Sequence, residues 1–333
     1  MTLRALHDVQ APAKLNLFLH VVGRRADGYH LLQSLFVLID WADRLHFERR
    51  EDGRLARHDL YRDPNDPAAA LPAEDLCLRA ARSLAAASGT SLGVDIHLDK
   101  RLPAGAGMGG GSSDAASTLL ALNRLWGLNW PRERLGAMGL ALGADVPFFV
   151  HGRNAFVEGI GERITPVVVP LLAYAVIKPR ASLDTAGIFA HPALGRDSEP
   201  VILTGFSGGR ALSSTPSADP GDAGPVNTRA SAWATEGFGR NDLQPPAEDR
   251  CPEVAEVARW LAARFGNSRM TGSGSAVFAR VDSIESSVPG TAASAEAMPA
   301  PSDPPTTLAG LPAGWVGRMC RGLARHPLLD WAG

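Results

Sequence analysis

A run of glycines in the first half of the chain constrains its fold more than any other feature. Residues 103–116 read PAGAGMGGGSSDAA, with five glycines before Ser113. Because glycine has no Cβ, the N–H groups of such a run can turn inward and come close to a ligand. The preceding residues 93–99 alternate between apolar and polar side chains, as in a half-buried strand, and an alanine- and leucine-rich stretch follows. This pattern predicts a strand, a glycine loop and a helix, and we expect Ser112 or Ser113 to cap that helix.

A glycine loop before a helix is a favourable seat for phosphate, since the first N–H groups of a helix are unpaired and its dipole attracts anions. A Walker loop would need a lysine where this chain has Gly111. The dinucleotide pattern GxGxxG matches at Gly105, Gly107 and Gly110, but residues 100–103 separate the strand from the loop. A dinucleotide-binding dehydrogenase is therefore the weakest of the phosphate-binding alternatives. If the glycine run bound no ligand, it would be a mobile linker.

The whole string resembles the phosphate loop of the GHMP kinases, in which a proline and small residues precede Gly-Leu/Met-Gly-Gly/Ser-Ser-Ser. Met108 stands where leucine is usual. The resemblance implies an α+β, two-domain fold, with an N-terminal ribosomal-S5-domain-2-like domain, a C-terminal ferredoxin-like α+β domain and the active site in the cleft between them. It also implies that the loop binds ATP through Pro103, Ala104, Gly105, Ala106, Gly107, Met108, Gly109, Gly110, Gly111, Ser112 and Ser113.

The N-terminal part of the chain narrows the resemblance to one branch of this family. Residues 11–40 read APAKLNLFLHVVGRRADGYHLLQSLFVLID. They are similar to the opening of the GHMP kinases of non-mevalonate isoprenoid biosynthesis, and the similarity covers residues 10–190 and returns at 241–243 and 272–275. It implies ATP-dependent phosphorylation of the 2-hydroxyl of a small-molecule substrate, a methylerythritol that carries a cytidine diphosphate.

Two charged residues are the candidates for catalysis. Lys14 and Asn16 share one face of the strand expected at 12–22, although a lysine near a strand start is usually solvated. Asp145 precedes a short apolar turn with a proline, where a helix N-cap is its ordinary role. The resemblance implies that both Lys14 and Asp145 belong to the active site. There Asp145 would orient the acceptor hydroxyl and accept its proton, and Lys14 would hold the carboxylate ionised.

The acceptor side is expected at two aromatic residues that follow a turn. Tyr29 and His30 come directly after Asp-Gly, and a simple hairpin with exposed rings would explain them equally well. The resemblance implies that His30 binds a cytosine edge, that Tyr29 stacks on the base and that Asn16 orients the substrate. It also implies contacts from Thr185 and from a second stacking ring, Phe189.

The metal is expected to be Mg²⁺, bound together with ATP. No acidic residue is marked as its ligand, so the metal ligands stay unknown at this stage. The hydroxyl of Ser112 or Ser113 is a candidate contact, and phosphate oxygens and water would supply the rest of the coordination, as is common for Mg²⁺.

Composition argues against several other classes of protein. The 333 residues carry 33 Lys and Arg against 35 Asp and Glu, so the net charge of −2 gives no reason to expect nucleic acid or an anionic membrane as a partner. No apolar run reaches the length of a membrane span, and residues 1–10 lack the apolar core of a signal peptide. Cys77, Cys251 and Cys320 fit neither a disulfide framework nor a zinc site. We expect a cytoplasmic protein that is a monomer or a weak homodimer.

The order of elements favours an α+β fold over a parallel Rossmann sheet, because strands and helices do not alternate strictly. We expect an N-terminal domain at 1–168 and a C-terminal domain at 169–333, with surface insertions at 207–231 and 282–312 where Ser, Ala, Pro, Gly and Thr dominate. The string MTGSGSAVFA at 270–279 resembles a third motif of the family. The expected strands are 12–22, 31–40, 45–49, 93–99, 155–158, 173–178 and 275–281, and the expected helices are 74–88, 112–126, 132–142, 145–150, 184–190, 252–265 and 315–325.

Two further functions stay open. Another GHMP kinase would act on a sugar or a mevalonate-like alcohol, but Tyr29 and His30 would then have no base to bind. A non-catalytic homologue that binds the ligand as a sensor could lose Lys14 or Asp145, and this chain keeps both.

Overall fold

The computed structural model describes residues 3–60, 71–201, 239–281 and 308–332, which form an α+β fold. Its strands are β1 (Ala5–Arg24), β2 (His30–Arg50), β3 (Leu55–Asp59), β4 (Gly93–Asp99), β5 (Ala155–Gly159), β6 (Arg163–Pro166), β7 (Ala173–Lys178), β8 (Arg269–Met270), β9 (Val277–Val281) and β10 (Val316–Leu323). Its α-helices are α1 (Leu76–Ser88), α2 (Gly110–Leu125), α3 (Arg132–Leu140), α4 (Val146–His151), α5 (Thr185–Phe189), α6 (Gln244–Arg250) and α7 (Pro252–Phe265), and a 3-10 turn, η5, covers Leu329–Trp331.

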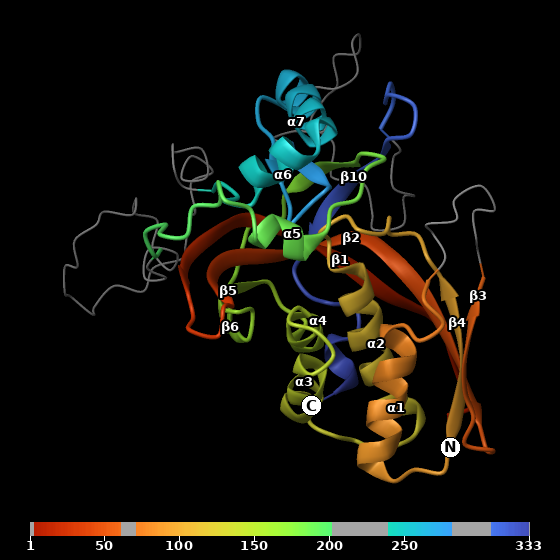
Figure 1. Ribbon diagram of the computed structural model, residues 1–333. Coiled ribbons are helices and arrows are strands. Elements are labelled where there is room, and N and C mark those ends of the chain that lie inside the picture. The colour runs from red at the N-terminus through yellow and green to blue at the C-terminus, as the bar shows by residue number, and fades with distance from the viewer. Residues whose placement is uncertain (1–2, 61–70, 202–238, 282–307, 333) are drawn as a thin grey trace, which may run out of the picture.

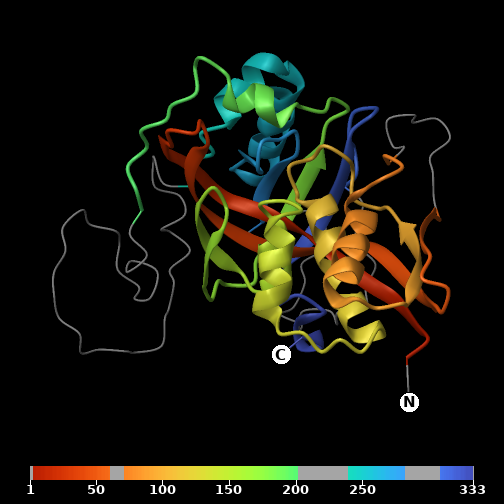
Figure 2. The ribbon, with the colours of Figure 1, turned by 60° about the horizontal axis from the view of Figure 1, so that its bottom comes forward.

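The strands of the described residues join into one sheet. Its path is β3-β4-β2-β10-β7-β9-β8, while β1 pairs with β2, and β5 pairs with both β2 and β6. The long strand β2 is central because it pairs with β1, β4, β5 and β10. In Figure 1, α1 to α4 lie below the β1–β2 pair and α5 to α7 lie above it; Figure 2 shows the helices of the lower group side by side.

Buried apolar side chains form three clusters. The first lies between the N-terminal strands and the helices α1 to α4, and it includes Phe47 and Leu119. The second joins β1 and β2 to β7 and β9, and Met108 of the glycine run belongs to it. The third packs α6 and α7 against β7 and β9, with Val257 fully buried. Burial of apolar surface, at roughly 25 cal/mol per Å², is the main stabilising contribution to such clusters. Through Met108, the second cluster anchors the glycine run to the core.

Most expected elements are confirmed, several with the same bounds. The strands at 93–99 and 173–178 and the helix at 252–265 appear as β4, β7 and α7. The strands expected separately at 31–40 and 45–49 are one continuous strand, β2, because its pairing with β1 runs through the intervening residues. The short elements β3, β6, β8 and α6 were not predicted, since two to seven residues carry too little periodicity.

The helix expected at 315–325 is wrong. Residues Val316–Leu323 form β10, which pairs with β7 over six residues and with β2 at Gly322 and Leu323. The apolar spacing of Met319, Cys320 and Leu323 is compatible with a helix, but Gly317 and Gly322 weaken one. Pairing along the open edges of β2 and β7 overrides that local preference.

Strands from both halves of the chain belong to the same sheet. Strand β10 lies between β2 and β7 in one sheet, and the last residues return to the N-terminal helices, where Arg132 donates to the backbone carbonyls of Leu329 and Ala332. The division into domains at 168 stays a prediction. The expected insertion at 207–231 lies outside the described residues, and so does that at 282–312 up to 307, whereas Leu308 and Leu311 pack against the third cluster.

Candidate active site

A cavity of about 900 Å³ lies where β1, the turn before β2, the glycine loop and the start of α5 meet. It is also lined by Gly272, Ser273 and Gly274, within the string expected to be a third motif. The structure thus brings together segments that are far apart in the sequence. The residues predicted for the site that line this cavity are Lys14, Asn16, Tyr29, His30, Gly105, Gly107, Gly109, Ser112, Asp145, Thr185 and Phe189.

The glycine loop has two faces that alternate along the chain. Gly105, Gly107 and Gly109 line the cavity and have positive φ angles of 61°, 73° and 71°, which residues with a Cβ rarely adopt. Between them, Ala106 and Met108 are buried in the second cluster. The two apolar side chains therefore hold the loop to the protein while the glycines present backbone to the cavity.

Backbone contacts hold the loop from two sides. The amide of Lys14 donates to the carbonyl of Met108 at 3.0 Å, and the amide of Ser275 donates to that of Gly105 at 3.1 Å. A Cβ added at Gly107 would lie 2.3 Å from the carbonyl oxygen of Thr271, so a side chain has no room there. The glycine turn at 271–275 thus abuts the loop directly.

The first turn of α2 corrects part of the prediction. Gly109 is the N-cap and α2 begins at Gly110, so neither Ser112 nor Ser113 caps it. The Ser113 hydroxyl donates to the Pro12 carbonyl at 2.7 Å, and its amide donates to Gly109 at 2.9 Å. Ser113 therefore offers no free donor to a nucleotide, and of these two serines it is Ser112 that lines the cavity.

The other expected loop residues, Pro103, Ala104, Gly110 and Gly111, are not among those that line the cavity. The amides of Gly110 and Gly111 nevertheless belong to the first turn of α2, where intrahelical partners are absent. These amides, with the helix dipole behind them, make the loop end of the cavity favourable for an anion.

Lys14 and Asp145 face each other inside the cavity. The Lys14 Nζ lies 3.6 Å from an Asp145 carboxylate oxygen and donates to Asn16 Oδ1 at 2.5 Å. It also lies 4.5 Å from the centre of the Phe36 ring. The lysine side chain is 4% exposed and that of the aspartate 30%, so the carboxylate is the more accessible member of the pair.

Burial lowers the pKa of Lys14 from its usual 10.5, and the Asp145 carboxylate acts in the opposite direction. The lysine, expected to be solvated if it had no special role, is thus an enclosed ammonium beside one carboxylate. Charge in such an enclosed place acts strongly on groups that enter the cavity.

Asp145 occupies the N-cap position of α4 but does not cap it, because its side chain makes no hydrogen bond to the helix amides. Its backbone is already helical, with φ −84° and ψ −15°. The ordinary capping role therefore does not explain this residue.

Asn16 connects three segments around the pair. Its Nδ2 donates to the Ser34 hydroxyl at 2.9 Å, its backbone amide donates to the Thr271 hydroxyl at 3.0 Å, and its Oδ1 accepts from Lys14. This fixes the amide oxygen toward the ammonium and ties β1 to β2 and to the glycine turn at 271–275.

Aromatic rings gather at the other end of the cavity. The rings of His30 and Phe189 are stacked, with centroids 5.0 Å apart and an interplanar angle of 29°. Tyr29 also lines the cavity and is 61% exposed, so its ring is open to solvent. The hydroxyls of Thr185 and Ser273 lie 2.8 Å apart and join α5 to the glycine turn at 271–275.

Comparison with known proteins shows the family to which the chain belongs. The model of the GHMP kinase N-terminal domain matches residues 75–153, and that of the GHMP kinase C-terminal domain matches residues 231–287. A 4-diphosphocytidyl-2-C-methyl-D-erythritol kinase of Methylibium petroleiphilum is 56% identical over 333 residues, covering all of both chains. The chain belongs to the GHMP kinase family. As a GHMP kinase, it is an ATP-dependent enzyme that acts on a small molecule.

Further relatives agree with this assignment. The enzyme of the same name from Polaromonas sp. strain JS666 is 51% identical and covers 99% of this chain and 95% of its own. A crystal structure of 4-(cytidine 5'-diphospho)-2C-methyl-D-erythritol kinase is 35% identical, with a TM-score of 0.60 over 82% of this chain and 88% of that one. Homoserine kinase from Cytophaga hutchinsonii, 17% identical with a TM-score of 0.60, shares the fold.

One buried ionic cluster of this GHMP kinase was not predicted. Lys100 Nζ contacts Asp43 and Asp114, and the Asp43 carboxylate accepts from the amides of Arg101 and Leu102, at 2.6 and 2.7 Å, just before the glycine loop. Burial alone would lower the pKa of Lys100, but Asp114 and Asp43 outweigh it and raise that pKa. A lysine directly after a strand was its one local signal.

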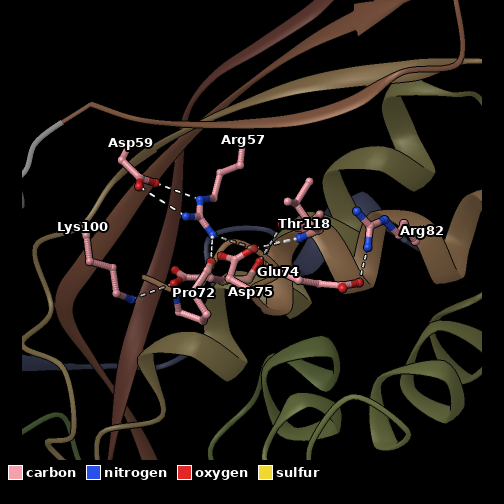
Figure 3. A network of polar contacts seen from close by, with 10 residues as sticks. Arg57, Asp59, Pro72, Glu74, Asp75, Arg82, Lys100 and Thr118 are labelled. Atoms are coloured by element: carbon pink, nitrogen blue, oxygen red, sulfur yellow. Dashed lines mark hydrogen bonds and ion pairs between the residues drawn. The ribbon is translucent and has the colours of Figure 1, made fainter. Parts of the chain in front are cut away.

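A second polar network holds the start of α1, next to this cluster. Arg57 contacts the carboxylates of Asp59 and Asp75 and the carbonyl of Pro72, and Asp75 caps α1 by accepting from the amide of Leu78 at 3.0 Å (Figure 3). Asp75 thus serves both the helix and the arginine.

Among the helices of the described residues, none has the length and apolar character of a membrane span.

Proposed function

We propose that this kinase transfers the γ-phosphoryl group of ATP to the 2-hydroxyl of 4-diphosphocytidyl-2-C-methyl-D-erythritol, giving the 2-phosphate and ADP. The reaction would serve non-mevalonate isoprenoid precursor biosynthesis. One observation carries the proposal: a single cavity joins the glycine loop and the Lys14–Asp145 pair to the cluster of rings at Tyr29, His30 and Phe189. The names of the full-length relatives support the same acceptor.

The chemistry requires mainly positioning and charge stabilisation, because phosphoryl transfer passes through a loose transition state. An ordinary carboxylate cannot deprotonate an alcohol in advance, since a free Asp titrates near ~3.9. We therefore assign Asp145 to orient the hydroxyl and to accept its proton as the bond to phosphorus forms. Lys14 would offset negative charge on the transferred group.

The donor side of the proposal uses the loop amides. The amides of Gly107 to Ser112 would bind the phosphates of ATP. Ser113, which was also expected to bind them, is left out because its amide and hydroxyl already donate within the protein. Mg²⁺ fits this end of the cavity because two oxygen donors, the Ser112 hydroxyl and the Asp145 carboxylate, both line it. In the described residues there is no group of three His, Cys, Asp or Glu that could hold a metal ion, so phosphate oxygens and water would complete the coordination.

The acceptor side uses the rings. His30 would bind the edge of the cytosine base, and Tyr29 and Phe189 would supply faces for stacking, while Asn16 and Thr185 would contact the rest of the substrate. The cavity volume of about 900 Å³ lies within the range of small-molecule sites. The expected cytoplasmic location and the expected monomer or weak homodimer belong to this proposal as well.

A panel of alcohols tests the acceptor. Purified protein with Mg-ATP is incubated with methylerythritol derivatives with and without a cytidine diphosphate, and with sugars and mevalonate. We expect turnover of the cytidylated alcohol alone. Turnover of mevalonate or a sugar instead would favour another kinase of the family, and binding without turnover of any alcohol would favour a ligand sensor.

A further inference from the structure

Arg196 is the residue that fixes the position of His30. Its Nε donates to His30 Nε2 at 3.0 Å. Its other nitrogens donate to the backbone carbonyls of Phe189, His191 and Leu194, at 2.9 to 3.2 Å. The guanidinium therefore cannot turn away without losing three further bonds, and it holds both stacked partners, His30 by the ring and Phe189 by the backbone.

The direction of this hydrogen bond decides where the proton of the His30 ring lies. A guanidinium has N–H donors and no acceptor, so the Nε2 atom of His30 must accept with its lone pair. The proton of the neutral ring is then on Nδ1, because one ring nitrogen donates when the other accepts. In the described residues, no hydrogen bond to Nδ1 is present, and His30 lines the cavity. Nδ1–H is thus the donor that the ring can offer to a ligand.

The electrical surroundings of His30 keep the ring neutral. Burial has the largest effect on the ring, and the positive charges of Arg196 and Arg24 add to it. Together they lower the pKa of His30 from 6.5. The acidic residue on the same turn is Asp27, whose carboxylate is bound to Arg25 at 2.7 Å and accepts from the amide of Tyr29 at 3.2 Å.

We propose that Arg196 is a positioning residue that sets His30 as an Nδ1–H donor and thereby selects cytosine over uracil in the acceptor. This rests on the proposed function, since it concerns the base carried by that substrate. Cytosine presents an unprotonated N3 that accepts a hydrogen bond. Uracil carries a proton on N3, which would face the Nδ1–H of His30 with two donors opposed. A site built around one hydrogen bond discriminates strongly against an analogue that cannot make it.

The first experiment reads the proton position directly. In ligand-free protein labelled with ¹⁵N-histidine, long-range ¹H–¹⁵N spectra at neutral pH should show His30 with a protonated Nδ1 and an unprotonated Nε2, and His30→Gln identifies the signal. Arg196→Met should abolish this preference. The matched control is Arg264→Met, because Arg264 lies over the Trp260 ring on α7 and is not among the residues that line the cavity.

The second experiment measures base selection. The ratio of kcat/KM for the cytidylated over the uridylated alcohol should fall about tenfold in Arg196→Met, the size of one hydrogen bond, while the KM for ATP changes less. Arg196→Lys keeps an N–H donor and should recover part of the ratio, which separates the hydrogen bond from a loss of packing.

Two results would overturn the proposal: a wild-type His30 with its proton on Nε2, or an unchanged ratio in Arg196→Met that still folds. If the wild-type enzyme turns over neither alcohol, the proposed function fails on its own, and the ¹⁵N spectra still decide whether Arg196 sets the proton of His30.

Discussion

At the scale of single residues, Lys14 shows how burial and one neighbour set a charge. Its ammonium is enclosed under the Phe36 ring and bonded to Asn16, with the Asp145 carboxylate 3.6 Å away. Burial works against the charge and the carboxylate supports it, and the net result is a lowered pKa. The proposed role of Lys14 depends on its keeping the proton at neutral pH.

This gives a prediction for the pH dependence of catalysis. Because the folded-state pKa of Lys14 lies below 10.5, the ammonium loses its proton below that pH, and kcat should fall as the pH rises through the lowered pKa. Stability changes in the opposite direction: in that window the unfolded chain binds the proton that the folded chain has lost, so the folded state gains stability as the pH rises. A kcat profile and unfolding titrations across alkaline pH, compared with Lys14→Met for the stability term, measure both.

The control for this prediction is Lys14→Arg. A guanidinium keeps its proton across the whole range, so this variant should lose rate through its different geometry but show no alkaline fall. A wild-type fall in kcat centred at or above pH 10.5 would mean that Lys14 is not the group responsible.

At the scale of elements, the glycine loop depends on its contact with the glycine turn at 271–275. Gly107 has φ 73°, and a Cβ there would come within 2.3 Å of the Thr271 carbonyl oxygen, a backbone atom that cannot swing aside. Gly127 at the end of α2 has a similar φ of 66°, but a Cβ there would meet nothing within 4 Å. A substitution at Gly127 therefore causes only left-handed backbone strain, whereas one at Gly107 adds a clash with the glycine turn at 271–275.

We predict that Gly107→Ala raises the KM for ATP at least tenfold, because the loop must move away from residues 271–275 and its amides lose their arrangement. Gly127→Ala should cost only roughly 1–2 kcal/mol of stability, from left-handed backbone strain, and leave the KM for ATP unchanged. Steady-state kinetics and thermal unfolding of both variants measure the difference. Equal effects of the two substitutions on ATP binding would show that the contact between the loops is unimportant.

The sequence predicts these elements where a local pattern is strong. The alternation of 93–99, the periodicity of 252–265 and the glycine run each lie within a short window, and each was located correctly. Lys14 and Asp145 were predicted from the resemblance of the strings around them, and the structure brings the two side chains to 3.6 Å. Arg196 was missed because its partner His30 lies 166 positions away, and Lys100 because Asp43 lies 57 positions away. Contacts of this kind depend on the tertiary fold, and the local sequence around each residue does not show its partner.

At the scale of the whole molecule, the site exists because the two halves of the chain are joined through one sheet. Strand β10 lies between β2 and β7, and this was the segment that the sequence wrongly predicted as a helix. The glycine turn at 271–275 and α5 come from the second half, while Lys14, Asp145 and the glycine loop come from the first. The cavity therefore requires both halves in their observed arrangement.

The most direct measurement is the single-turnover rate of phosphoryl transfer in Asp145→Asn. The variant keeps the size of the side chain and removes its charge, so the rate at saturating Mg-ATP should fall by about 10²–10⁴, the usual contribution of an acid–base group. Asp249→Asn, which removes an exposed carboxylate paired with His191, serves as the control and should react at the wild-type rate. A near-normal rate in a folded Asp145→Asn protein would contradict a catalytic centre built on the Lys14–Asp145 pair facing the glycine loop.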